Sequence, residues 1–248
     1  MGTEIFRNET KGYSEKSILI MKNKTLLIFD VYGTIISTGN GSINAVESIL
    51  SLQDKSVNSD LFYAEWKKFH RENMNNANIN TFLSEEKIFE NDLKLLYEKY
   101  NIKKDYSDDV SIMLSSLIGR KCFEDTKSTI DELRKNYRVV LGSTTDTEPL
   151  MENLRLNELS VDAVYTSEII EKYKPDIEFY KYILKSENCN AENAVFIGDS
   201  LIDDIFGPKQ LEIKTVLIDR NNKYNLENQS IKPDFVIHNL TELLALNL

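Results

Sequence analysis

Side chains that could take part in chemistry follow four short apolar runs of this sequence. They are carboxylates, one hydroxyl and one ammonium: Asp30, Ser143, Lys174, Asp199, Asp203 and Asp204. Asp30 comes directly after the run LLIF, whereas the last three belong to the segment GDSLIDD. Ligands of open parallel sheets bind beyond the carboxyl ends of the strands. If the four runs are neighbouring strands, these side chains converge on one site.

A converged set of this kind has a definite chemistry. Clustered carboxylates repel one another, and their pKa values rise unless a cation neutralises them. Oxygen ligands suit a hard divalent cation, and Mg²⁺ is the usual one beside phosphates. A lysine and a hydroxyl can hold the other phosphoryl oxygens. A carboxylate that faces phosphorus can act as a covalent nucleophile. The pattern therefore indicates magnesium-dependent chemistry on a phosphate ester.

The elements that must position these groups can be predicted from hydrophobic patterning. Short apolar, β-branched runs predict strands at 25–29, 138–141, 163–165, 194–197, 215–218 and 235–237. Apolar residues three or four apart predict helices between the later strands, at 148–156, 177–187 and 203–211. Strands that alternate with helices predict an α/β fold, a three-layer Rossmann-like core whose parallel sheet carries helices on both faces.

The segment between the first two predicted strands differs, because it contains no good strand pattern. It predicts helices at 43–52, 61–73, 84–100, 108–118 and 126–136, with an Asn-rich turn, NMNNANIN, at 73–80. The last of these helices leads into the second strand and belongs with the sheet. We therefore expect an N-terminal extension at 1–22, a core domain at 23–38 and 122–248, and an inserted all-helical domain at 39–121.

Composition excludes several classes of function. The 248 residues carry a net charge of −10, which argues against a nucleic-acid partner. The sequence contains no apolar run of the ~20 residues that cross a bilayer, so no membrane association is expected. The two cysteines, Cys122 and Cys189, predict partly exposed or packed thiols in a reducing, cytoplasmic environment. The oligomeric state is not predicted.

The four motifs FDVYGT, LGSTTD, YKPDIEFY and FIGDSLIDDIFGPK together resemble those of the haloacid dehalogenase superfamily of hydrolases. The resemblance extends from Lys24 to the C-terminus, and the helical insert resembles the mobile cap of that superfamily. It implies that Asp30 is the nucleophile and that Thr34 orients it. It also implies that Ser143 and Lys174 bind the phosphoryl group, and Thr144 is expected beside them.

The resemblance further implies a Mg²⁺ site. Its ligands would be Asp30, Asp199, Asp204 and the main-chain carbonyl of Tyr32. Asp203 is the neighbour of Asp204 and matches the motif less well. The expected activity is hydrolysis of a small phosphorylated metabolite through an aspartyl-phosphate on Asp30.

One residue departs from the phosphatases of this superfamily. They usually carry a second Asp two places after the nucleophile, where it acts as acid and base. This chain has Tyr32, and free tyrosine has a pKa of about 10. Hydrolysis of phosphate esters is therefore expected to be slow. Tyr32 also raises two alternatives: a metal-free 2-haloacid dehalogenase with an ester intermediate on Asp30, or a catalytically weak metal- or ligand-binding module.

The retained Asp199 argues against the dehalogenase alternative, as does the segment AEWKKFHREN, where Lys67 follows Trp66. The dehalogenases carry arginine there, and lysine lacks its planar fork. Lys67 is predicted to contact substrate. The neighbouring His70 and Arg71 are expected to be solvated. The nearby aromatic residues are expected to pack within the insert: Phe62, Tyr63, Trp66 and Phe69. Elsewhere, the pair Asp146-Thr147 is expected to cap the helix that follows it.

Overall fold

A six-stranded parallel sheet forms the centre of the computed structural model, which describes residues 24–52, 57–227 and 229–248. The strand order is β3-β2-β1-β4-β5-β6. The strands are β1 (Leu26–Phe29), β2 (Arg138–Ser143), β3 (Ala163–Thr166), β4 (Ala194–Gly198), β5 (Lys214–Ile218) and β6 (Phe235–Ile237). The predicted parallel sheet is confirmed. The expected extension at 1–22 lies outside the described residues.

Helices cover both faces of the sheet. They are α6 (Thr126–Leu133), α7 (Thr147–Leu156), α8 (Ser167–Ile170), α9 (Ile177–Ser186) and α10 (Gly207–Lys209), with 3-10 helices η2 (Ala191–Asn193) and η4 (Leu240–Ala245). Leu27 and Phe29 of β1 pack with α6, α7 and η4, whereas Leu26 and Ile28 pack with α9. This alternation is the period of two that a strand imposes, and it divides the core into two layers.

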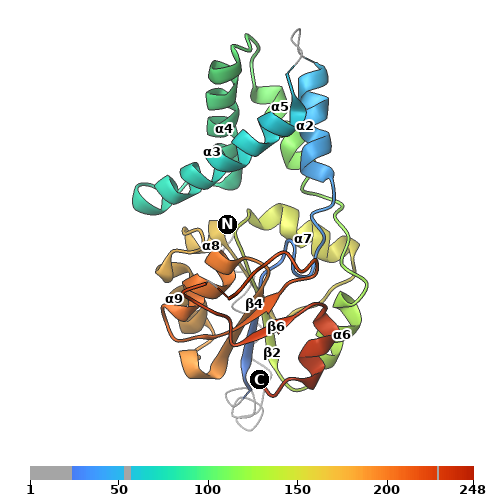
Figure 1. Cartoon of the computed structure of the whole chain (residues 1–248), viewed down its shortest axis with the longest axis vertical. Helices are drawn as coiled ribbons and strands as arrows, with labels where there is room; N and C mark the ends of the chain where they lie inside the picture. The colour runs from blue at the N-terminus through green and yellow to red at the C-terminus, as the bar shows by residue number, and fades with distance from the viewer. Residues whose placement is uncertain (1–23, 53–56, 228) are drawn as a thin grey trace, which may run out of the picture.

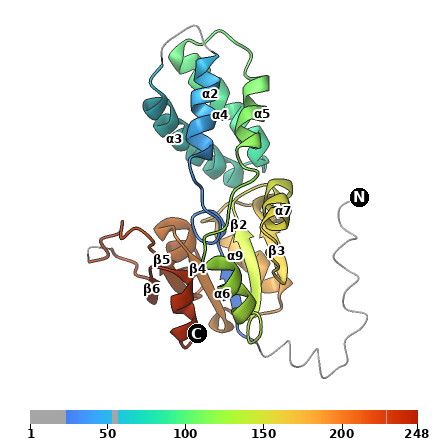
Figure 2. The same ribbon diagram turned by 90° about the vertical axis from the view of Figure 1, so that its right-hand side faces the viewer.

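The segment between β1 and β2 folds into a separate helical bundle. Its helices are α2 (Gly41–Ser51), α3 (Ser59–Ile79), α4 (Glu85–Tyr100) and α5 (Ser107–Ser115). They share one buried cluster that includes Val46, Phe62, Trp66 and Leu93. The expected packing of the aromatic residues within the insert is confirmed, since Tyr63 and Phe69 border the same cluster. Figure 1 and Figure 2 show the bundle on one side of the sheet domain, which it joins through two connecting segments.

Two predicted elements differ from the structure. The Asn-rich segment is not a turn: α3 continues through it to Ile79. Met74 and Ala77 are buried there, and their packing outweighs the weak helix propensity of asparagine. The helix predicted at 203–211 is instead a π-helical turn, η3 (Leu201–Phe206), followed by the short α10. Its wider turn accompanies a side chain of Asp204 that folds back onto the end of β4.

The structure also bears on the cysteines and on the length of the apolar helices. Cys122 and Cys189 are both free and partly buried, as predicted. Among the helices of the described ranges, none has the length and hydrophobicity required to span a bilayer.

Candidate functional site

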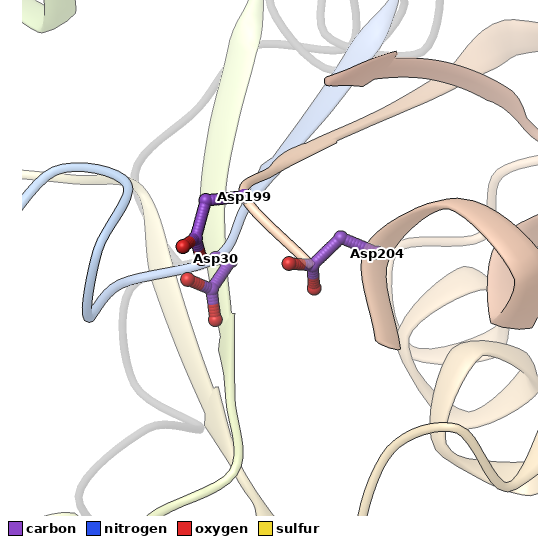
Figure 3. A group of neighbouring side chains, drawn as sticks. All are labelled: Asp30, Asp199 and Asp204. Atoms are coloured by element: carbon purple, nitrogen blue, oxygen red, sulfur yellow. The ribbon is translucent and has the colours of Figure 1, made fainter. Parts of the chain in front are cut away.

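The carboxylates of Asp30, Asp199 and Asp204 come together where β1 and β4 end. Each residue offers an oxygen within 4.8 Å of the other two (Figure 3). The sheet register accounts for this meeting, because Phe29 of β1 is the partner of Ile197 of β4. Asp30 and Asp199 therefore leave adjacent strands at nearly the same level. The convergence predicted for these strand ends is confirmed for the three acids.

Close packing of the main chain keeps this group compact. The loop after β1 passes directly against Asp199 at Gly33, whose φ is +98°. A Cβ atom at Gly33 would lie 2.8 Å from Asp199 Oδ2, so only glycine fits both the conformation and the space. Gly33 of the Gly-Thr pair thus allows the ends of β1 and β4 to lie close together.

Lys174 lies at the centre of the site. Its side chain is 1% exposed, and its Nζ lies 2.8 Å from Asp30 Oδ1 and 2.7 Å from Asp204 Oδ1. Burial by itself lowers the pKa of a lysine. Here the negative charges of Asp204, Asp30 and Asp203 outweigh that effect and raise the pKa of Lys174. The ammonium stays charged and joins two of the three carboxylates.

The two oxygens of Asp30 have different partners. Oδ1 faces Lys174, and Oδ2 accepts a hydrogen bond of 2.9 Å from the buried hydroxyl of Thr34. These contacts hold the carboxylate in one orientation. Ser143 is buried at the end of β2, two residues beyond Leu141, which is the register partner of Phe29. The partly buried Thr144 follows it on the same edge of the sheet.

Asp199 lies at the rim of the site and has a cation that the sequence analysis did not single out. Lys223 Nζ lies 3.2 Å from Asp199 Oδ2, and the hydroxyl of Tyr224 donates to the main-chain oxygen of Asp199. Burial and the charge of Asp30 raise the pKa of Asp199 in spite of Lys223. No local pattern marks Lys223, because it approaches from the segment after β5. Three mutually repelling carboxylates with oxygen donors fit a hard divalent cation such as Mg²⁺.

Two residues of α3 that were expected to be solvated contact acidic groups instead. Arg71 forms a bidentate ion pair with Asp203, with N–O distances of 3.0 and 2.7 Å. His70 Nδ1 lies 2.8 Å from Asp92 Oδ2, and the ring stacks on Phe89. The expectation for His70 was wrong, because its side chain is only 21% exposed. Arg71 is exposed as expected, at 45% of its side chain, but its acidic partner was not predicted. An exposed helix face and a face that meets another domain have the same polar composition, so the sequence does not separate them.

Roles were also predicted from the sequence for Lys67 and Asp146, and the structure gives their surroundings. Lys67 is exposed, and its Nζ lies 4.7 Å from the centre of the Tyr63 ring. Asp146 precedes α7 but makes no side-chain cap there. Its carboxylate instead accepts hydrogen bonds from the main-chain N–H groups of Glu85 and Glu86, at 2.9 and 3.2 Å. The acid therefore caps α4 of the bundle, and the predicted cap of α7 was wrong.

A comparison of the whole chain with protein families identifies this arrangement. Residues 27–218 match the family described as haloacid dehalogenase-like hydrolases. The chain belongs to this family of hydrolases. The resemblance noted in the motifs is confirmed, and so is the fold class that it implies.

Relatives of this haloacid dehalogenase-like hydrolase include named phosphatases. A glyceraldehyde 3-phosphate phosphatase of Pyrococcus furiosus is 25% identical over 235 residues, which cover 90% of this chain and 93% of that protein. A protein of the same name from Methanocaldococcus jannaschii is 33% identical over 126 residues, 49% of this chain. That match spans about half of the relative, 54%.

Solved structures share the fold of this family member at low identity. The HAD-hydrolase YfnB from Bacillus subtilis bound to magnesium has a TM-score of 0.74 at 20% identity, covering 90% of this chain and 97% of that one. The L-2-haloacid dehalogenase from Xanthobacter autotrophicus with chloropropionic acid covalently bound has a TM-score of 0.70 at 14% identity, covering 89% and 96%. The fold is therefore common to metal-bound and dehalogenating members.

Tyr32 is where this family member departs from the phosphatase pattern, and its hydroxyl has a structural partner. Asn153 of α7 donates a hydrogen bond of 3.0 Å to the phenol oxygen. The guanidinium of Arg120 lies over the ring, 5.1 Å from its centre. Burial raises the pKa of Tyr32 to about 12, although the hydrogen bond from Asn153 opposes the shift. The phenol thus stays protonated and cannot act as a base near neutral pH.

Proposed function

We propose that this hydrolase is a Mg²⁺-dependent phosphomonoesterase that acts through an aspartyl-phosphate on Asp30. The observation that carries the proposal is the group formed by Asp30, Asp199 and Asp204 around Lys174. A metal-free haloacid dehalogenase does not need three carboxylates arranged as the ligands of a cation, Asp199 among them. A phosphatase needs them to hold the cation that accompanies its substrate.

The names of several relatives support a phosphate substrate. Two archaeal relatives are named glyceraldehyde 3-phosphate phosphatase, and relatives from Bacillus anthracis are named pyrophosphatase PpaX. These names describe substrates that differ in size and charge but share a phosphoryl group. We therefore assign a small phosphorylated metabolite as the class of substrate.

The proposed reaction begins with attack by an Asp30 carboxylate oxygen on phosphorus. A bond forms between that oxygen and phosphorus, and the bond between phosphorus and the ester oxygen breaks. The alcohol leaves with the electron pair and takes a proton from solvent. Water then attacks the same phosphorus, the bond to Asp30 breaks, and inorganic phosphate is released while a proton returns to solvent.

The residues around Asp30 have separate roles in this proposal. Thr34 orients the attacking carboxylate, and the hydrogen bond of 2.9 Å supports that role. Lys174, Ser143 and Thr144 bind phosphoryl oxygens as negative charge develops on them. Asp30, Asp199, Asp204 and the main-chain carbonyl of Tyr32 would hold Mg²⁺. When bound, the cation would neutralise the carboxylates and polarise the phosphoryl group.

The missing second Asp has a consequence for the range of substrates. With a phenol pKa of about 12, Tyr32 is a much weaker proton donor to the leaving oxygen than a carboxylic acid at this position would be. Esters whose leaving group is stable as an anion need no such proton. Aryl and acyl phosphates should therefore react faster than alkyl phosphates.

We further propose that the helical insert at 39–121 is the cap that selects substrate, against the core at 23–38 and 122–248. The contacts between Arg71 and Asp203 and between Glu85 and Asp146 support this, because they lie beside the catalytic loops. Lys67 on the same insert is exposed, and we retain it as a proposed contact to substrate.

Phosphate release from a panel of aryl, acyl and alkyl phosphates, with Mg²⁺ and with EDTA, tests the proposed function. The expected result is metal-dependent release that Asp30→Asn abolishes. Asp131→Asn, on an exposed position of α6, is the matched control and should leave the rate unchanged. Halide release from a 2-haloacid that ignores EDTA would instead establish the dehalogenase alternative. Mg²⁺ binding without turnover of either substrate would establish the binding module.

A further inference from the structure

The loop that carries Lys174 is held from the other side by the helical bundle. The side-chain amide of Asn78, near the end of α3, pairs with both main-chain groups of Tyr173. Asn78 Nδ2 donates to the oxygen of Tyr173 at 2.9 Å, and the N–H of Tyr173 donates to Asn78 Oδ1 at 2.7 Å. One side chain thus makes the pair of hydrogen bonds that a neighbouring strand would make. It fixes the two peptide groups that flank Tyr173, and the second of them joins Tyr173 to Lys174.

The side chain of Tyr173 is inserted into the bundle. It is 0% exposed and lies in a cluster with Met74, Ala77 and Ile88 of the two bundle helices. Its ring stacks on Phe82 with a centroid distance of 5.3 Å. Its hydroxyl donates to the main-chain oxygen of Leu83 at 2.9 Å. This residue of the sheet domain therefore has its side chain packed in the helical insert.

The residues on either side of Tyr173 reach the bundle as well. Lys172 Nζ donates to the main-chain oxygen of Asn78, and Arg71 Nη1 lies 3.5 Å from the main-chain oxygen of Lys174. Arg71 is also paired with Asp203, the neighbour of Asp204. The bundle therefore contacts three consecutive residues whose last member points its ammonium at Asp30.

We propose that Asn78 and Tyr173 are positioning residues that make closure of the bundle the event that places Lys174 against Asp30. The inference rests on the proposed function, because it assigns Lys174 its role at the phosphoryl group. When the bundle moves away, Tyr173 loses its packing and the loop loses both hydrogen bonds. The main chain beside Lys174 then keeps the hydrogen bond from the N–H of Asp176 to the oxygen of Tyr173, but it is less constrained where Lys174 reaches Asp30 and Asp204. Closure of the bundle over substrate and placement of Lys174 beside Asp30 and Asp204 thus occur in the same step.

The test compares Asn78→Ala with Asn75→Ala, a matched control at an exposed position of the same helix. Asn78→Ala removes both hydrogen bonds to Tyr173 and alters no side chain at the sheet edge itself. The expected result is a kcat lower by about 10- to 100-fold, since small misplacements of catalytic groups have effects of that size. KM for an aryl phosphate should change by less than about twofold. The control should match the wild type in both.

Hydrogen–deuterium exchange supplies a readout that does not depend on turnover. Asn78→Ala should raise exchange in the segment 172–174 without raising it in the strands of the sheet. Tyr173→Phe keeps the ring and loses only the bond to Leu83, so it should have a smaller effect than Tyr173→Ala. A thermal unfolding curve like that of the wild type shows that each variant is folded.

The outcomes separate the two proposals. Phosphate release by the wild type with unchanged exchange and unchanged kcat in Asn78→Ala overturns the positioning role and leaves the phosphatase intact. Raised exchange with an unchanged kcat, or with only KM increased, also overturns it. If the wild type releases no phosphate from any ester, the proposed function fails. Exchange alone then decides whether the bundle holds the loop, and unchanged exchange refutes the coupling.

Discussion

Buried carboxylates occur in two regions of this molecule and have different surroundings. In the helical bundle, Asp92 is 0% exposed and faces three hydrogen-bond partners of its own: Trp66 Nε1 at 3.0 Å, His70 Nδ1 at 2.8 Å and Asn73 Nδ2 at 2.6 Å. At the sheet edge, the buried Asp30 and Asp204 and the half-buried Asp199 face one another.

The number of cations and donors per acid explains the difference. Asp109, which is also fully buried in the bundle, is paired with Lys104 and with the hydroxyl of Tyr97. At the sheet edge, Asp30 and Asp204 share Lys174, and Asp199 is paired with the half-exposed Lys223. A carboxylate surrounded by its own donors stabilises a fold. Carboxylates that face each other lower stability until a cation arrives.

The largest expected effect of this contrast is on metal-dependent turnover. Asp199→Asn removes one negative charge from the sheet edge and weakens the proposed Mg²⁺ site. We expect phosphate release to fall by about a thousandfold, or about 4 kcal/mol of transition-state free energy. The same variant should raise the melting temperature of the metal-free protein, because it relieves repulsion with Asp30. A lower melting temperature in EDTA would contradict the view that these acids repel.

Asp92→Ala, in contrast, should lower the stability of the protein. It leaves the indole N–H of Trp66 and the amide of Asn73 buried without an acceptor. We expect the free energy of unfolding to fall by about 3 kcal/mol, measured by urea denaturation. Asp92→Asn keeps the shape and one acceptor oxygen and should cost less. A variant as stable as the wild type would show that this buried acid is not structural.

Glu85 lies between the two regions and should give a smaller, pH-dependent effect. Burial raises its pKa, although His70 and the hydroxyl of Thr145 oppose the shift; Asp146 lies beside it. Because the folded pKa exceeds the unfolded one, the folded state binds the proton more tightly. Stability is then full below the unfolded pKa and declines as pH rises through the folded pKa. Urea denaturation across this range should show that decline in the wild type and a weaker one in Glu85→Gln. Parallel curves would refute it.

The smallest expected effect concerns the residue that departs from the family pattern. Tyr32→Phe removes the hydrogen bond from Asn153 and keeps the ring under Arg120. We expect a loss of about 1 kcal/mol in stability and a kcat within about twofold of the wild type. Steady-state kinetics with an aryl phosphate measures this. A hundredfold loss of kcat would identify the phenol as the missing acid and contradict a purely structural role for Tyr32.

Most of the fold follows from patterns that are local in the chain. Each predicted strand is present within two residues of its observed ends, because strands buried on both faces consist of continuous apolar runs. The segment 73–80 was misassigned because its helix depends on contacts that are not local in the chain. Its asparagines have low helix propensity, and the packing of Met74 and Ala77 against Tyr173 comes from a residue almost 100 positions away. No local pattern carries that information.

The candidate site likewise combines residues that could be predicted from the sequence with contacts that could not. The sequence alone was enough to predict that the acids, the hydroxyls and Lys174 lie together, because the carboxyl ends of parallel strands meet at one edge of the sheet. The contacts between the bundle and that edge became known only from the tertiary structure. They are the ion pair of Arg71 with Asp203, and the hydrogen bonds of Asp146 with the start of α4 and of Asn78 with the main chain of Tyr173. A polar side chain on a helix looks the same in sequence whether it faces water or another domain. Its partner is chosen by the packing of whole elements.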